Sequence, residues 1–248
     1  MNIDKESFAI LDKLELPVKP VAVGFFQYKP PEGVPKSKGK VRFCEMPKIA
    51  RDQGPFYFDR EDHECDAAKH VLGQGEAPPA YLSGVYAKEL KGYGTASAGR
   101  RPYYTTTVLH RNSTDYVACS TLDKLSFEPD VLIIGAKTKQ AATIMHARSW
   151  TTGEPAGGKV TFSMACSWIY IRPYVTGEIN CIPADFSIGM RRSPVYPEGL
   201  IVISIPFELV PSILDSLREM PWTNPCHEPG GMDWKEQVRI EVGLGPSS

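Results

Sequence analysis

Pro129-Asp-Val-Leu-Ile-Ile-Gly135, with the residues that follow it up to Trp150, carries the strongest structural signal in the chain. The run from Val131 to Ile134 is apolar at successive positions and too short for a helix, which is typical of a strand buried on both faces. After Gly135, the segment Gln140 to Trp150 places apolar side chains at helical spacing. These residues predict a strand, a turn and a helix, and so a sheet covered by helices.

Strands and helices alternate in the same way on both sides of this unit. Strands are predicted at 21–27, 56–58, 116–120, 159–163 and 199–205, and helices at 3–16, 45–53, 64–72, 81–90, 166–171 and 207–220. We therefore expect an α/β or mixed α+β fold with a largely covered sheet, in a single domain spanning residues 1–248. Within it, 1–110 and 111–222 are candidate sub-lobes. A tail at 223–248 would add an edge strand at 237–242.

The composition excludes several classes of protein. The chain has 248 residues, 42% hydrophobic and 23% charged, as expected for a globular protein rather than a fibrous or disordered one. Its 28 basic and 29 acidic side chains leave no positive field to hold nucleic acid. No apolar run approaches the ~20 residues that cross a bilayer, and the N-terminus lacks the pattern of a secretory signal. We therefore expect a cytoplasmic protein that binds neither nucleic acid nor membrane.

Cysteines are the side chains most suited to chemistry here, and there are six: Cys44, Cys65, Cys119, Cys166, Cys181 and Cys226. In a cytoplasmic chain of this length, we expect them to be reduced. Cys65 and Cys166 fall in the first turns of predicted helices and Cys44 directly precedes another, where free amide groups favour a thiolate. Three thiolates that meet would bind a metal. Their spacing matches neither a zinc ribbon nor a ferredoxin motif, so buried inert thiols are the alternative.

Several stretches of the chain resemble domain-of-unknown-function family 169. They are Cys44 to Gln53, Glu61 to Gly73, Phe127 to Gly135, Gln140-Ala, Ala165-Cys166, Pro173 to Asn180, Gly189-Met-Arg191, and the last strand with Pro206 and its helix. Members of that family occur mainly in anaerobic bacteria and archaea and typically carry cysteines matching Cys44, Cys65 and Cys166. The resemblance therefore implies an oxygen-sensitive iron–sulfur cluster, of the 4Fe-4S type, in anaerobic metabolism.

The fourth ligand of such a cluster is less defined. Many relatives in that family carry a further cysteine shortly before the Gly-Met-Arg triplet, where this chain has Asp185-Phe-Ser. Cys181 lies nearby and is the candidate for the fourth position, which is otherwise filled by another group or left open. An open iron would bind a small anionic ligand, with the planar guanidinium of Arg191 holding the anion and the lysines of loop 29–40 adding positive charge.

Other interpretations stay open. One alternative is a non-catalytic metal-handling or electron-transfer module, and zinc is the alternative metal. With His146 as a base for Cys166, it would be a hydrolase or transferase without metal. His63 is a candidate nitrogen ligand beside Cys65, and Cys119 is expected in the core. A redox or metabolic partner protein and a homo-oligomeric state are compatible with the metal-binding functions.

Overall fold

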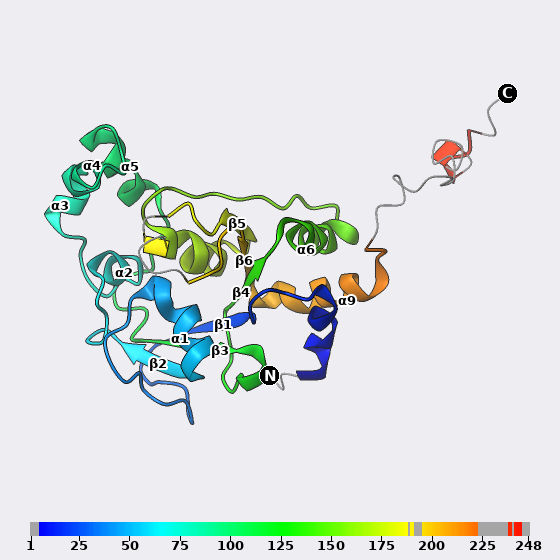
Figure 1. The fold of residues 1–248 in the computed structure, drawn as a ribbon, viewed down its shortest axis with the longest axis horizontal. Coiled ribbons are helices and arrows are strands. Elements are labelled where there is room, and N and C mark those ends of the chain that lie inside the picture. Colours follow the sequence, from blue (N-terminus) through cyan, green and yellow to red (C-terminus); the bar gives the residue numbers. More distant parts are fainter. Residues whose placement is uncertain (1–4, 188, 191–194, 223–237, 240, 245–248) are drawn as a thin grey trace.

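The computed structural model describes residues 5–187, 189–190, 195–222, 238–239 and 241–244 (Figure 1). At the centre of this part of the chain is a six-stranded sheet with the order β2-β3-β1-β4-β6-β5, in which every neighbouring pair is antiparallel. The strands are β1 (Val21–Phe26), β2 (Phe56–Asp59), β3 (Tyr116–Thr121), β4 (Val131–Ala136), β5 (Asn180–Pro183) and β6 (Ile201–Pro206). The fold is therefore mixed α+β, one of the two expected classes.

Helices cover both faces of the sheet. One face packs against η1 (Lys5–Leu14), α6 (Thr138–Trp150) and α9 (Val210–Glu219). The other packs against α1 (Met46–Gln53), α2 (Asp66–Val71) and a helical stretch made of the π-helical η4 (Ser167–Ile171) and α7 (Arg172–Thr176). The shorter segments η2 (Phe43–Glu45), η3 (Leu122–Lys124) and η5 (Phe207–Leu209) join these elements. None of the described helices is long and apolar enough to span a membrane.

The apolar run in β4 is explained by two separate cores. Val131 and Ile133 belong to the core on the α1 and α2 face, whereas Leu132 and Ile134 belong to the core on the α6 and α9 face. Successive strand residues point to opposite faces, so a strand between two cores must be apolar throughout. Each such side chain, at most 1% exposed, contributes about 1.5–3 kcal/mol to folding.

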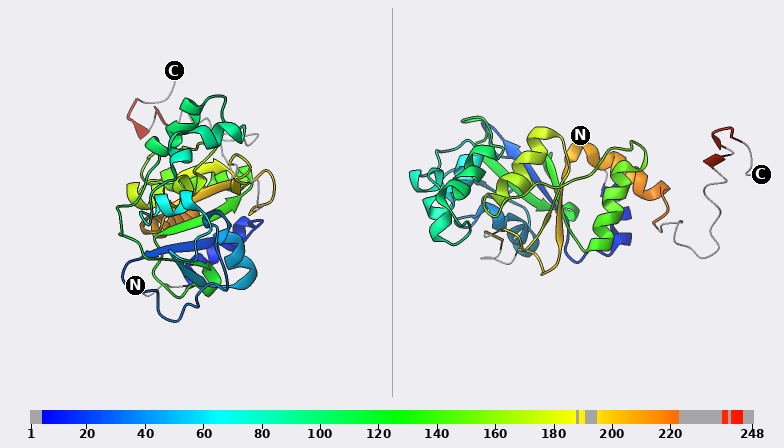
Figure 2. Two further views of the ribbon diagram at one scale, coloured as in Figure 1. Left: turned by 90° about the vertical axis from the view of Figure 1, so that its left-hand side faces the viewer. Right: turned by 90° about the horizontal axis from the view of Figure 1, so that it is seen from above.

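Beside α2 lies a unit of three short helices, α3 (Pro79–Leu82), α4 (Val85–Glu89) and α5 (Ala96–Thr105), which pack on one another. We call residues 79–105 the cap. Seen from above, the cap and α6 lie at opposite ends of the molecule (Figure 2). Gly84 adopts φ +75°, and a Cβ there would lie 2.0 Å from the carbonyl oxygen of Ala96. Only glycine therefore allows α4 and α5 to approach so closely.

The structure differs from the sequence-based expectations in several places, and one of them is β5, which was not expected. Residues 159–163 form no strand, because both backbone polar groups of Lys159 bond to the side chain of Asn180. The helix expected at 81–90 is broken at Gly84 into two, and α5 was not expected. In the expected strand 237–242, Val238, Arg239 and Glu241 are helical, and the other residues up to 240 lie outside the described ranges.

Candidate functional site

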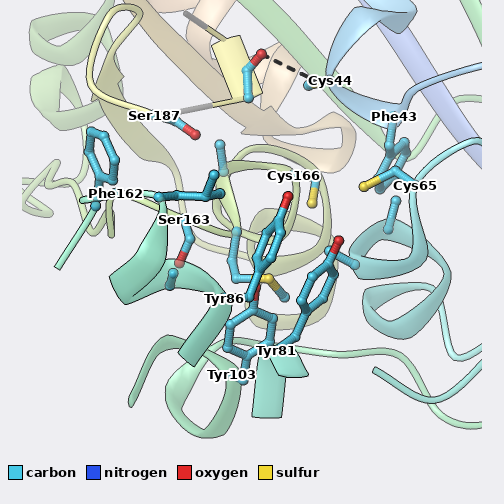
Figure 3. A pocket seen from close by; sticks show the side chains of 18 of the residues that line it. Phe43, Cys44, Cys65, Tyr81, Tyr86, Tyr103, Phe162, Ser163, Cys166 and Ser187 are labelled. Carbon is cyan, nitrogen blue, oxygen red and sulfur yellow. Dashed lines mark hydrogen bonds between the residues drawn. The ribbon is translucent and has the colours of Figure 1, made fainter. Parts of the chain in front are cut away.

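A cavity of about 160 Å³ lies between the cap and the helices that cover the sheet (Figure 3). Its lining comes from segments far apart in the sequence: 43–44, 65–68, 81–103, 162–166 and residues 187 and 189. Cys44, Cys65 and Cys166 all line it. The fold thus brings to one cavity the three thiols that sequence analysis singled out.

Each of these thiols stands at the start of a helix, as expected. Cys44 lies in η2, which leads directly into α1. Cys65 is the N-cap residue of α2, with extended backbone angles and no side-chain capping bond. Cys166 lies in the first turn of the helical stretch that ends with α7. Just before that turn, Met164 adopts φ +65°, a left-handed conformation that is strained for a side chain of this size and often marks a functional site.

Burial, not the helix start, dominates the acidity of the Cys44 and Cys166 thiols. It raises the pKa of Cys44 to about 11, with a further increase from the neighbouring Cys65 thiol. Burial raises the pKa of Cys166 well above its usual range, and Cys65 and Cys44 raise it further. The three thiols are therefore electrostatic neighbours. Because desolvation outweighs the helix dipole, Cys44 and Cys166 are protonated at neutral pH unless a positive centre binds them.

Four tyrosines, together with Ala87, Leu90 and Gly92, form the part of the lining contributed by the cap. We call Tyr81, Tyr86, Tyr93 and Tyr103 the tyrosine wall. The rings of Tyr81 and Tyr86 lie 4.5 Å apart between centroids, and those of Tyr81 and Tyr103 lie 5.8 Å apart. In Figure 3 the hydroxyls of Tyr81 and Tyr86 point toward the side of the cavity where Cys65 and Cys166 lie. Burial, as the largest cause, raises the pKa of Tyr81 to about 12, so its hydroxyl is a donor at neutral pH.

Sequence analysis missed these tyrosines. Tyr81, Tyr86 and Tyr103 lie in helices of four to ten residues, too short for an amphipathic period to show, and Tyr93 lies between α4 and α5. The aromatic content of 81–104 is the only signal that the sequence offered.

The other two described cysteines do not line the cavity. Cys119 lies fully buried on β3, in the core on the same face of the sheet, as expected. Cys181 lies on β5 and packs into the core of the opposite face, where its sulfur is 3.6 Å from the Met145 sulfur. The structure thus does not bring Cys181 to the other three thiols. Arg191, the expected anion-binding residue, lies outside the described residues, as does Cys226.

Neither candidate histidine lines the cavity. His63 is buried edge-on against the rings of Phe43 and Phe58, and burial lowers its pKa to about 4. Its two ring nitrogens have no hydrogen-bond partner in the described part of the chain. His146 is exposed on α6, on the opposite face of the sheet from Cys166, and packs on Trp150. The expected pairing of Cys166 with His146 is therefore absent among the described residues.

The lysines of loop 29–40 also lie away from the cavity. Lys36 forms ion pairs with Asp59 and Asp62, at 2.7 and 3.2 Å. Lys36, Lys38 and Lys40 line a separate pocket near the end of α1. In the cavity itself, none of the described lining residues is Asp, Glu, Lys, Arg or His. Within the described ranges, the expected positive charge for an anion is thus not present at the thiols.

No single-ion site is formed by the described residues: nowhere do three or more His, Cys, Asp or Glu side chains stand in a group that could hold a metal ion. A tetrahedral ion with bonds near 2.3 Å requires sulfurs only about 3.8 Å apart. The three thiols share a cavity but are not grouped for one ion.

The protein is of the mixed α+β class, with an antiparallel sheet and, on one face of that sheet, a cavity lined by thiols and tyrosines. The sequence profile of domain-of-unknown-function family 169, described as uncharacterised ArCR, matches residues 9–216, and the chain belongs to this family. The resemblance seen in the sequence is thereby confirmed. The matched range contains all the segments that line the cavity. No curated protein and no solved structure gives a significant match.

Proposed function

We propose that the protein is a cytoplasmic iron–sulfur protein of anaerobic metabolism, with a 4Fe-4S cluster held by Cys44, Cys65 and Cys166. One observation carries the proposal: three thiols from three separate segments line one cavity, and the other described residues of its lining are uncharged. Cysteines buried only for packing are distributed through a core without meeting, as Cys119 and Cys181 are.

The arrangement of the thiols favours a cluster over a single zinc ion. A zinc site needs its donors grouped tightly, and the described residues contain no such group. In a cluster each cysteine binds a different iron, so its ligands lie farther apart than those of one ion. Thiolates are also the preferred ligands of iron–sulfur clusters, and all three candidate ligands are thiols.

A bound cluster would supply electron transfer or Lewis-acid chemistry at the thiol side of the cavity. Its iron would also supply positive charge, which stabilises the thiolate form of Cys44 and Cys166 although burial raises the pKa of both thiols. Among the described residues, no fourth cysteine and no histidine lines the cavity. One iron would then accept a ligand from solution, which favours an enzyme that binds a small molecule over a module that only transfers electrons.

Anaerobic purification with analysis of iron and acid-labile sulfide tests this proposal. We expect both elements, together with broad brown absorption that dithionite bleaches. Cys44→Ser, Cys65→Ser and Cys166→Ser should each lose most of the iron, because a serine hydroxyl is harder and far less acidic than a thiol. Cys181→Ser is the matched control and should keep it. Full iron in all three variants, or stoichiometric zinc without iron, would contradict the cluster.

A further inference from the structure

The tyrosine wall presents a binding surface of defined chemistry. Every described residue that lines the cavity is uncharged, so a charged ligand would lose its water without gaining a partner of opposite charge. An anion would in addition lie beside three thiols that become negative when they bind metal. This environment selects against anions and favours a neutral ligand.

The hydroxyls of the wall determine which polar group such a ligand carries. Tyr93 is already engaged, because its hydroxyl accepts from the backbone amide of Ser163 at 3.2 Å and bonds to the Ser163 hydroxyl. The hydroxyls of Tyr81 and Tyr86 bond to each other, which uses one of their two hydrogens. For the Tyr103 hydroxyl, the described residues supply no hydrogen-bond partner. Two O–H donors therefore remain for an acceptor on a ligand.

The cavity is open on the cap side. Tyr86 and Leu90 both line it, yet they are 36% and 42% exposed. They form a mouth through which a ligand can enter and from which it can project, so its size is not limited to the enclosed volume. The tyrosine rings at this mouth favour a flat ligand that packs against their faces and edges.

We propose that the tyrosine wall binds an uncharged, flat organic molecule through an oxygen acceptor, such as a carbonyl group, that receives hydrogen bonds from the tyrosine hydroxyls. This inference deepens the proposed function and rests on it, since the ligand would lie between the tyrosine wall and the thiols that hold the cluster. It replaces the small anion expected from the sequence with a neutral ligand.

Three probes of the same shape and different charge test the inference: benzamide, benzoate and benzamidine. Binding to the purified full chain is measured by ligand-observed NMR and by calorimetry at neutral pH, where the three are neutral, anionic and cationic. We expect benzamide to bind at least tenfold more tightly than the other two. Equal or tighter binding of benzoate or benzamidine would overturn the inference, because it would reveal a charged group that faces the cavity. Absence of benzamide binding would overturn it as well.

A pair of variants on α5 locates the binding. Tyr103→Phe removes one hydroxyl and keeps the ring, and it should weaken benzamide about threefold to tenfold. Tyr104→Phe is the matched control, because Tyr104 is 68% exposed and does not line the cavity. The affinity of this variant for benzamide should be unchanged. Equal affinity in both variants would contradict a role for the wall.

Iron and sulfide are determined in every sample, which separates the two proposals. Iron without a preference for benzamide contradicts only the class of ligand. A preference for benzamide in protein that cannot bind iron supports the class of ligand and contradicts the cluster.

Discussion

Serine substitutions at Cys119 and Cys65 should have opposite effects on stability and on the cofactor. Cys119 has no exposed surface and lies on β3 between Val23 and Phe56 of the adjacent strands. A hydroxyl buried there without an acceptor costs about 1–3 kcal/mol. For a chain of this length, that corresponds to a fall in Tm of roughly 2–12 °C. The iron content should not change, because Cys119 does not line the cavity.

Cys65→Ser should give the reverse result. Cys65 is the N-cap residue of α2 and makes no capping bond, whereas serine is among the best N-cap residues. The apo protein should therefore be unchanged or more stable, by up to about 1 kcal/mol, while it loses its cluster. Calorimetric unfolding of the apo proteins and iron analysis after anaerobic reconstitution give the two measurements. Full iron in Cys65→Ser together with loss of iron in Cys119→Ser would refute the assignment of ligand and core thiols.

Three further predictions follow from single contacts. Burial raises the pKa of Asp130 to about 6. The folded state therefore holds this proton more tightly than the unfolded state does, and the free energy of unfolding falls as pH rises from about 4 to 6. In urea unfolding, Asp130→Asn should remove this fall and add about 1–3 kcal/mol to the free energy of unfolding at pH 7.5. If the mutant and the parent show the same fall, another group causes it. Gly84→Ala should destabilise the cap by more than about 2 kcal/mol, seen as faster hydrogen exchange over 79–105, whereas Gly94→Ala, where a Cβ meets open space, should not. The Asn180 side chain is 2% exposed and makes three hydrogen bonds, two to the Lys159 backbone and one to the Trp168 carbonyl. Asn180→Ala removes them and should lower the free energy of unfolding in urea by about 2–4 kcal/mol. An unchanged urea midpoint would show that these bonds are replaced.

The elements predicted well are those whose signal lies in a single segment. β4 is apolar at every position because two cores meet on it. β1, which lies between β3 and β4 in the sheet, is apolar for the same reason. The alternation of strands and helices left α/β and α+β equally open. The choice between them depends on strand pairing over long sequence distances, which local periodicity does not contain.

The errors arose where side chains take the place of regular backbone pairing. Residues 159–163 have the composition of a strand, with Val160 and Phe162 alternating, but the Asn180 side chain supplies the bonds that a neighbouring strand would have supplied. The cap was not resolved into helices because its longest helix has ten residues and its turns depend on glycines such as Gly84. More than a third of the cavity lining therefore lay in the cap, the part of the sequence that periodicity describes least.

For the site, helix-start signals identified Cys44, Cys65 and Cys166, but no sequence signal excluded Cys181 as their fourth partner. That separation depends on the face of the sheet to which each side chain points. Cys181 and Ile182 are adjacent on β5, yet Cys181 packs against the α6 face and Ile182 against the α2 face. A shift of one residue in strand register would exchange them, and no sequence pattern in this short edge strand fixes the register.

Several features that cost the protein stability lie around the cavity. The Cys44 and Cys166 thiols there are desolvated, and two non-glycine residues, Lys91 and Met164, adopt left-handed backbone angles at its edge. A chain selected only for stability would fill such a cavity with apolar side chains, since each of these features is unfavourable in the free protein. A ligand that binds all three thiols would offset these costs in the folded state alone. It would connect the segments on either side of the edge strand β2 with the segment that precedes the opposite edge strand β5. The cost of the cavity in the free protein is thus the physical reason to expect that function, not packing, maintains it.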